Sequence, residues 1–366
     1  MRQKTYVADC IFDGENFKEN VAVSIRNGKV TAVFPTQELP KGTSVTALKG
    51  TLVAPAFIDL QINGAGGLMF SSNPSVGALS EIYHYSRTGG ATHFLATIPT
   101  NSLKLIQKAV EAVSAYWAEG LPGLLGLHLE GPFINPLKKG AHLEKFIKRP
   151  TLKDAQELVA AGKGTIKLIT LAPECCPDEV IQYLLDQHIL LSAGHSNASY
   201  KEALHGFSLG IGMCTHLYNA MSPLTHKDAG LVGAALDCQV YAGIIADGVH
   251  VNSTAFNLAS QLLNDRLFYV TDAVTEVHSS TYQYSLSGNH YVTPQGTLAG
   301  SCLKMNTAVA NAIAMGTQKG AALRSAATIP AKSMGWEHTW GKIAPGYSVD
   351  WVILDRQYQV VDTLTE

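Results

Sequence analysis

The sequence predicts an α/β fold: a (β/α)8 TIM-like barrel with a small β-sandwich domain formed by the N- and C-terminal segments. Two observations predict it. In the middle of the chain, eight short apolar runs alternate with stretches of helical periodicity, whereas both ends carry β-rich runs separated by turn residues. The chain has 366 residues, 46% hydrophobic and 15% charged, which is ample material for a large core.

The two ends of the chain read as strands. Near the N-terminus, the runs Val21–Ile25 and Val30–Val33 flank Asn27-Gly28, a strong signal for a β-hairpin. Near the C-terminus, the run Asp350–Leu354 follows Pro345-Gly346. We expect residues 1–54 and 338–366 to pair into one discontinuous β domain that brackets a barrel of residues 55–337.

Between the ends, short apolar runs predict strands and the gaps between them predict helices. The amphipathic stretch Leu103–Trp117 predicts one helix, and Thr151 with Asp154 resembles a capping box. Further helices are expected over 177–187 and 199–210. An open doubly wound sheet is the alternative, but no G-x-G-x-x-G follows the first strand. The eight expected strands are Phe57–Ile62, His93–Thr97, Leu124–Glu130, Ile166–Leu171, Ile189–His195, Gly212–His216, Ala242–Asp247 and Leu267–Asp272.

Polar residues gather where these strands end. Glu130 ends the third strand, His195 the fifth and His216 the sixth. In a barrel these ends meet at one face, and one Glu with two His is the ligand set of a catalytic zinc site. We therefore expect one divalent metal ion, with Zn as the default and Fe, Mn or Co as alternatives. Pairing of Glu130 with a nearby Lys, or a turn-capping role, is the simpler alternative.

Asp272 ends the eighth strand and is the candidate general base. A metal at this face would lower the pKa of a bound water and polarise a carbonyl oxygen, and a base must then lie beside the water. A helix N-cap or a fourth metal ligand are the other roles open to Asp272. The chain has no G-x-S-x-G motif, so nothing supports a serine nucleophile.

Charge and composition exclude several classes of partner. A formal net charge of −2 gives no reason to expect nucleic acid. No apolar run approaches the length of a bilayer span, and the first ten residues lack a signal-peptide core. The six cysteines include the adjacent pair Cys175-Cys176 but no C-x-x-C motif. We expect a cytoplasmic protein without a disulfide framework.

Seven motifs follow one another along the chain: PAFIDLQINGAGG (55–67), HLEGPFINPLKKGAH (128–142), SAGHSNASY (192–200), THLYNAM (215–221), IADGVH (245–250), VTDA (270–273) and GTLAGS (296–301). In this order they resemble the N-acetylglucosamine-6-phosphate deacetylases of the amidohydrolase superfamily. The resemblance implies a (β/α)8 barrel with a β-sandwich built from both termini. It also implies metal-dependent hydrolysis of the acetamide of N-acetyl-D-glucosamine 6-phosphate to D-glucosamine 6-phosphate and acetate, in amino-sugar catabolism.

The same resemblance implies roles for individual residues. Glu130, His195 and His216 match the metal ligands, and Asp272 matches the catalytic acid/base. His142 matches a second catalytic residue, near the substrate amide. The resemblance also implies a homodimer, in which Lys227 reaches the phosphate in the neighbouring active site. The positions that match substrate contacts are Ala141, His142, Asn219, Ala220, Lys227, His250, Leu298, Ala299 and Gly300.

Three departures from the family pattern matter. Gln61 and Asn63 stand where many amidohydrolases have His-x-His for a second metal, so we expect a single metal with these amides bonding water or neighbouring ligands. Lys227 stands where Arg is common, and Lys binds phosphate as a point charge. Residues 274–280 differ from the expected small-residue loop.

The rival functions are deacylation of another N-acetyl amino sugar or an N-acyl amino acid, and sugar-phosphate binding without catalysis.

Overall fold

The computed structural model describes residues 4–48, 50–278 and 282–366. Its centre is a parallel sheet of eight strands that follow one another in chain order. The sheet closes where its first and last strands meet: the Asp272 N–H donates to the Gln61 oxygen at 2.9 Å, and the Asn63 N–H donates to the Ala273 oxygen at 2.8 Å. The predicted barrel is therefore confirmed, and the open doubly wound sheet is excluded. The strands are β6 (Phe57–Ile62), β9 (Ala91–Pro99), β10 (Leu124–Glu130), β11 (Ile166–Leu171), β12 (Leu190–Ala193), β13 (Met213–Cys214), β14 (Tyr241–Ile244) and β15 (Leu267–Tyr269).

All eight predicted strands are present, but the last four end earlier than the apolar runs suggested. β12 ends two residues before His195, β13 two residues before His216, and β15 three residues before Asp272. These three residues adopt positive φ angles of 47°, 32° and 46°. Such backbone leaves the extended conformation, so the three side chains project from turns just beyond the strands.

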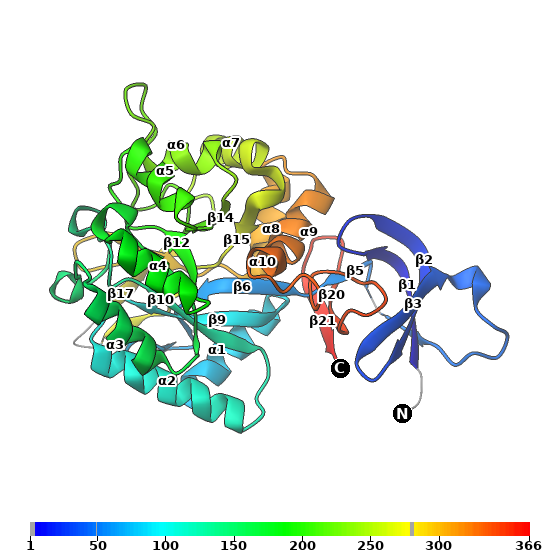
Figure 1. Ribbon diagram of the computed structural model, residues 1–366. Coiled ribbons are helices and arrows are strands. Elements are labelled where there is room, and N and C mark those ends of the chain that lie inside the picture. The colour runs from blue at the N-terminus through cyan, green and yellow to red at the C-terminus, as the bar shows by residue number, and fades with distance from the viewer. Residues whose placement is uncertain (1–3, 49, 279–281) are drawn as a thin grey trace.

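Helices pack around the outside of the barrel (Figure 1). Thr151 and Asp154 form the predicted capping box: Thr151 Oγ1 accepts from the Asp154 N–H, and the Asp154 carboxylate accepts from the Thr151 N–H at 2.8 Å. Pro177 and Ser199 precede their helices as N-cap residues rather than forming the first turn. The helices are α1 (Val76–Thr88), α2 (Leu103–Ala118), α3 (Leu152–Gly162), α4 (Asp178–Asp186), α5 (Tyr200–Ser208), α6 (Gly230–Asp237), α7 (Ser253–Leu263), α8 (Met305–Ala314), α9 (Lys319–Ala326) and α10 (Thr328–Ser333).

The two ends of the chain share one sheet, as predicted, and lie together beside the barrel (Figure 1). β20 pairs with β5 antiparallel, and Asn27 and Gly28 form the hairpin turn with φ angles of 54° and 69°. The sheet has a core of its own around Trp351. The domain limits at 54/55 and 337/338 stay predictions. The strands, in the order of the sheet, are β21 (Val360–Thr365), β20 (Asp350–Leu354), β5 (Leu52–Pro55), β1 (Lys4–Phe12), β2 (Phe17–Arg26) and β3 (Lys29–Pro35), with β4 (Thr46–Ala47) on β1.

A four-stranded sheet follows β15, in a region for which the sequence analysis predicted no strands. Its strands are β16 (Val277–His278), β17 (Gln283–Ser287), β18 (His290–Val292) and β19 (Leu298–Ser301). Part of the divergent segment 274–280 lies outside the described residues. A short hairpin, β7 (Gly64–Ala65) with β8 (Leu68–Met69), follows β6. Across the residues described, no helix combines the length and apolarity needed to cross a membrane.

Candidate metal centre and active-site pocket

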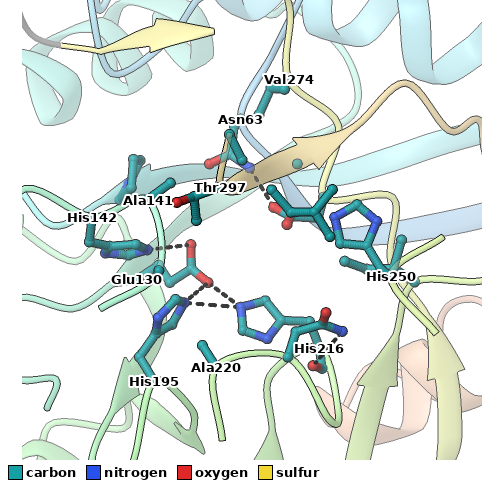
Figure 2. A pocket seen from close by; sticks show the side chains of 18 of the residues that line it. Asn63, Glu130, Ala141, His142, His195, His216, Ala220, His250, Val274 and Thr297 are labelled. Carbon is teal, nitrogen blue, oxygen red and sulfur yellow. Dashed lines mark hydrogen bonds and ion pairs between the residues drawn. The ribbon is translucent and has the colours of Figure 1, made fainter. Parts of the chain in front are cut away.

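A pocket of about 310 Å³ opens at the face of the barrel where the strands end (Figure 2). The residues expected at the site from the sequence come mainly from the loops after β6, β10, β12, β13, β14 and β15, and from β19. Thirteen of them line this one pocket: Asn63, Glu130, Ala141, His142, His195, His216, Asn219, Ala220, His250, Asp272, Leu298, Ala299 and Gly300.

Glu130, His195 and His216 meet on one side of the pocket (Figure 2). Glu130 Oε1 lies 3.1 Å from His195 Nε2 and 2.8 Å from His216 Nε2. The two Nε2 atoms are 3.1 Å apart, and all three residues are buried. One ligand atom from each lies within 4.8 Å of the others, which suits a single metal ion. Glu130 has no lysine partner among the described contacts, which argues against the alternative that Glu130 simply pairs with a nearby Lys.

The hydrogen-bond partners of His195 suit a metal ligand. Its Nδ1 lies 2.9 Å from the Lys138 carbonyl oxygen, which only accepts, so Nδ1 carries the hydrogen. In the neutral ring, the lone pair on Nε2 then faces the carboxylate oxygen of Glu130. Two electron-pair donors at 3.1 Å repel each other unless a cation, either a proton or a metal ion, lies between them. A hydrogen bond from the far ring nitrogen to a carbonyl is also the usual way of orienting a histidine ligand.

The amides that replace a second metal site contact the carboxylates. Gln61 Nε2 donates to Glu130 Oε1 at 3.0 Å and to Asp272 Oδ1 at 3.2 Å. Asn63 Nδ2 donates to the same Asp272 oxygen at 2.7 Å. Both amides therefore supply N–H donors at positions where histidines would supply lone pairs. This chemistry fits one metal held by Glu130 and the two histidines, with Asp272 beside it.

The two carboxyl groups are in opposite electrostatic situations. Burial raises the pKa of Glu130, but the neighbouring His142, His195 and His216 outweigh burial and hold that pKa well below its usual range. Burial, and then repulsion from Glu130, raise the pKa of Asp272 above its usual range. Glu130 thus stays ionised, as a metal ligand must, whereas Asp272 is suited to take up and release a proton. Asp272 caps no described helix.

His142 enters the pocket as a neutral hydrogen-bond donor. Burial, and then the neighbouring His195, lower the pKa of His142 to about 4. The backbone N–H of Thr100 donates to His142 Nδ1 at 3.3 Å, so the ring hydrogen lies on Nε2. That Nε2 is 3.4 Å from Glu130 Oε2. The ring therefore presents an N–H to the centre of the pocket rather than a positive charge.

His250 is held at the opposite side of the pocket from the loop after β14. Its Nδ1 lies 2.6 Å from Asp247 Oδ2, and Asp247 Oδ1 also accepts the backbone N–H groups of Val249 and His250 at 2.8 Å. Burial raises the pKa of Asp247, but the bond from His250 outweighs it and leaves the pKa lowered. An ionised Asp247 fixes the hydrogen of His250 on Nδ1 and leaves Nε2 for a ligand.

Two expected site residues do not line this pocket: Gln61, which bonds to Glu130 and Asp272, and Lys227, which lies apart from it. Lys227 is exposed on the loop between β13 and α6, which projects from the barrel at the top of Figure 1. The pocket also has lining residues that the sequence did not single out, among them Leu137, Ile245, Tyr284 and Thr297. Leu137 lies within the motif that carries His142, so proximity to that histidine was a usable signal. Tyr284 comes from β17, and no local pattern placed that strand beside the metal ligands.

Comparison with known proteins supports the fold and identifies the family. The model of the amidohydrolase family matches residues 52–365. An N-acetylglucosamine-6-phosphate deacetylase of Haemophilus influenzae is 33% identical over 358 residues, covering 94% of this chain and 93% of the relative. An N-acetylgalactosamine-6-phosphate deacetylase of Shewanella sp. strain ANA-3 is 33% identical over 361 residues, covering 94% and 90%.

A solved structure also resembles this chain over its whole length. The crystal structure of N-acetylglucosamine-6-phosphate deacetylase from Pasteurella multocida superposes with a TM-score of 0.94 at 30% identity, covering 100% of this chain and 98% of the other. The resemblance seen in the motifs is thereby confirmed. The chain belongs to the amidohydrolase family.

Proposed function

We propose that this protein hydrolyses the acetamide of N-acetylglucosamine 6-phosphate to acetate and glucosamine 6-phosphate. The observation that carries the proposal is the placing of Asp272, a carboxyl group with a raised pKa, beside the buried Glu130, His195 and His216 in a single pocket. Relatives named as deacetylases of amino-sugar phosphates match nearly the whole chain. N-acetylgalactosamine 6-phosphate is the second candidate substrate, because relatives at similar identity carry that name.

Each step of the reaction has a group suited to it. A divalent metal bound by Glu130, His195 and His216 would acidify water and polarise a carbonyl group. Asp272 takes a proton from the attacking water and returns it to the departing nitrogen when the C–N bond breaks. The His142 N–H donates to the acetyl oxygen as negative charge develops on it. Zn is the metal we propose, with Fe, Mn and Co as alternatives, and we place the enzyme in the cytoplasm.

Acetate release from matched sugars tests the proposal. Purified, metal-loaded protein is assayed with N-acetylglucosamine 6-phosphate, N-acetylgalactosamine 6-phosphate and the two unphosphorylated sugars. We expect the highest kcat/KM for the first substrate. A higher value for the galactosamine compound would move the assignment to the second candidate. Release from none of the four, with metal bound, would favour an N-acyl amino acid substrate or a role in binding alone.

We expect His142→Gln to lower kcat by roughly 10- to 1,000-fold, because one preorganised donor to the developing oxyanion is lost. His142 is already neutral above a pH of about 5, since its pKa is lowered to about 4. A bound cation would lower that pKa further. The loss should therefore be the same across pH 6 to 9. A loss that grows with falling pH would contradict the neutral-donor role.

We also propose a homodimer in which Lys227 binds the phosphate in the partner's site. The same side of the barrel carries exposed leucines: Leu224 is 57% exposed, and Leu258 and Leu262 of α7 are each 52% exposed. Leu224 lies beside Gly233 of α6, which packs against α7. Apolar surface of this kind is typical of an interface between subunits.

Lys227→Ala should raise KM for phosphorylated substrates by roughly 10-fold or more, because a charge-assisted contact is lost. The unphosphorylated sugars should be unaffected. Lys201→Ala, another exposed lysine, is the matched control. Mixing Lys227→Ala with inactive Asp272→Asn subunits should restore a low KM, because one site of each mixed dimer then has both groups. No recovery on mixing would place the Lys227 contact within its own subunit or exclude it.

A further inference from the structure

Asp59 is a buried carboxylate that does not line the pocket. It lies on β6 inside the barrel and is 1% exposed. None of the ion pairs found among the described residues involves it. Burial raises its pKa to about 6, although three hydrogen bonds favour the ionised form. Burying an ionised carboxylate without a cation partner costs free energy, and the hydrogen bonds that the carboxylate accepts offset part of that cost.

All three hydrogen bonds to Asp59 come from residues next to the active site. Its Oδ1 accepts the N–H of Gln61 and the N–H of Thr271, each at 3.2 Å. Its Oδ2 accepts the hydroxyl of Thr271 at 2.5 Å. The hydroxyl oxygen of Thr271, Oγ1, in turn accepts a hydrogen bond from the N–H of Ala273 at 3.2 Å. Asp59 and Thr271 therefore hold the peptide N–H groups on both sides of Asp272.

Asp272 needs such support because its backbone is strained. Its φ of 46° lies in the left-handed region, which is unfavourable for a non-glycine residue and persists only where the surroundings enforce it. Asp272 follows the end of β15, and its own N–H donates to Gln61 of β6 at 2.9 Å. Asp59 bonds to Gln61 and to Thr271, so it ties together the two segments that set the direction of the Asp272 side chain.

We propose that Asp59, acting through Thr271, is a positioning residue that holds Asp272 in the orientation required for proton transfer. The inference rests on the proposed function, since it assigns Asp59 to the same site. The hydrogen bonds between Asp59 and Thr271 form a clamp, and breaking this clamp leaves the reacting groups themselves unchanged. A misplaced base should therefore slow the chemical step while substrate and metal still bind.

The test compares two substitutions of Thr271. Thr271→Val keeps the shape of the side chain but removes the hydroxyl that bonds to Asp59 and Ala273. We expect kcat to fall roughly 10- to 100-fold, with KM and bound metal unchanged. Thr271→Ser restores the hydroxyl and should restore kcat to within a few-fold of the parent protein. Thr165→Val, a buried threonine whose hydroxyl donates to the Gly162 oxygen at 2.8 Å, is the control and should keep its kcat.

A folded Thr271→Val protein with the parent kcat would overturn the inference, as would equal losses in Thr271→Val and Thr165→Val. If Thr271→Val does not fold, Asp59→Asn tests the other end of the clamp. Asparagine keeps the volume but has one acceptor oxygen where the carboxylate has two, so either the two N–H groups or the Thr271 hydroxyl lose their acceptor. We therefore expect kcat to fall in the same way; an unchanged kcat would overturn the inference. If the parent protein itself releases no acetate, the proposed function fails instead.

Discussion

Replacing Asp272 by asparagine should reduce the rate of acetate release by roughly 100- to 10,000-fold, the range expected when a general acid–base residue is removed. Asparagine occupies the same space and can still bond to Asn63, whose Nδ2 lies 2.7 Å from Asp272 Oδ1. It cannot accept a proton at pH 7. KM and bound metal should therefore change little, which separates this effect from damage to the metal centre.

The pH profile makes this prediction sharper. The base must be ionised, and the pKa of Asp272 is raised by burial and by Glu130. In the parent protein, kcat/KM should therefore rise with pH as Asp272 loses its proton, and a bound cation moves this limb to lower pH. The pH profile of Asp272→Asn should lack this rise in kcat/KM. Asp350→Asn, a buried carboxylate in the terminal sheet, is the control. An Asp272→Asn enzyme with the parental rate and profile would exclude Asp272 as the base.

Removing the metal should abolish acetate release, and adding it back should restore release. Glu130, His195 and His216 are buried together, and the proposed mechanism relies on the cation that they would hold to acidify water. Dialysis against a chelator, followed by Zn(II), Fe(II), Mn(II) or Co(II) in separate samples, measures both the requirement and the preferred metal. Elemental analysis of the purified protein should give one ion per chain, because Gln61 and Asn63 are poor ligands for a second.

His195→Ala should lose both metal and activity, since one of three protein ligands is gone. His205→Ala is a suitable control, because His205 is an exposed histidine that pairs with Asp178 at 2.9 Å on the outer helices. Full activity after complete chelation would refute the metal mechanism. Two tightly bound ions per chain would instead refute the single-metal site and assign ligand roles to the first-strand positions.

Much of the fold was readable from the sequence because local patterns encode it. β6, β10 and β11 have the bounds that their apolar runs predicted, and β6 and β10 end where the runs meet Asn63-Gly64 and Gly131-Pro132. The hairpin at Asn27-Gly28 and the capping box at Thr151 were also predicted, since turn and cap chemistry involves neighbouring residues. Glu130, His195 and His216 could be named because polar residues at strand ends of a barrel share one face.

Other features required the tertiary structure, because they join residues far apart in the chain. Asp59 and Thr271 are 212 positions apart, and their contact exists only where the barrel closes. The neutral state of His142 depends on Thr100, 42 positions away, and on burial beside His195. The sheet β16–β19 and its Tyr284 had no signal strong enough to place them at the pocket. By itself, the sequence determined which polar residues stand where the strands end, and so predicted the site. Packing across the barrel decided their hydrogen-bond partners, the shifts of their pKa values and the strained backbone that aims Asp272, because these depend on which distant groups are buried together.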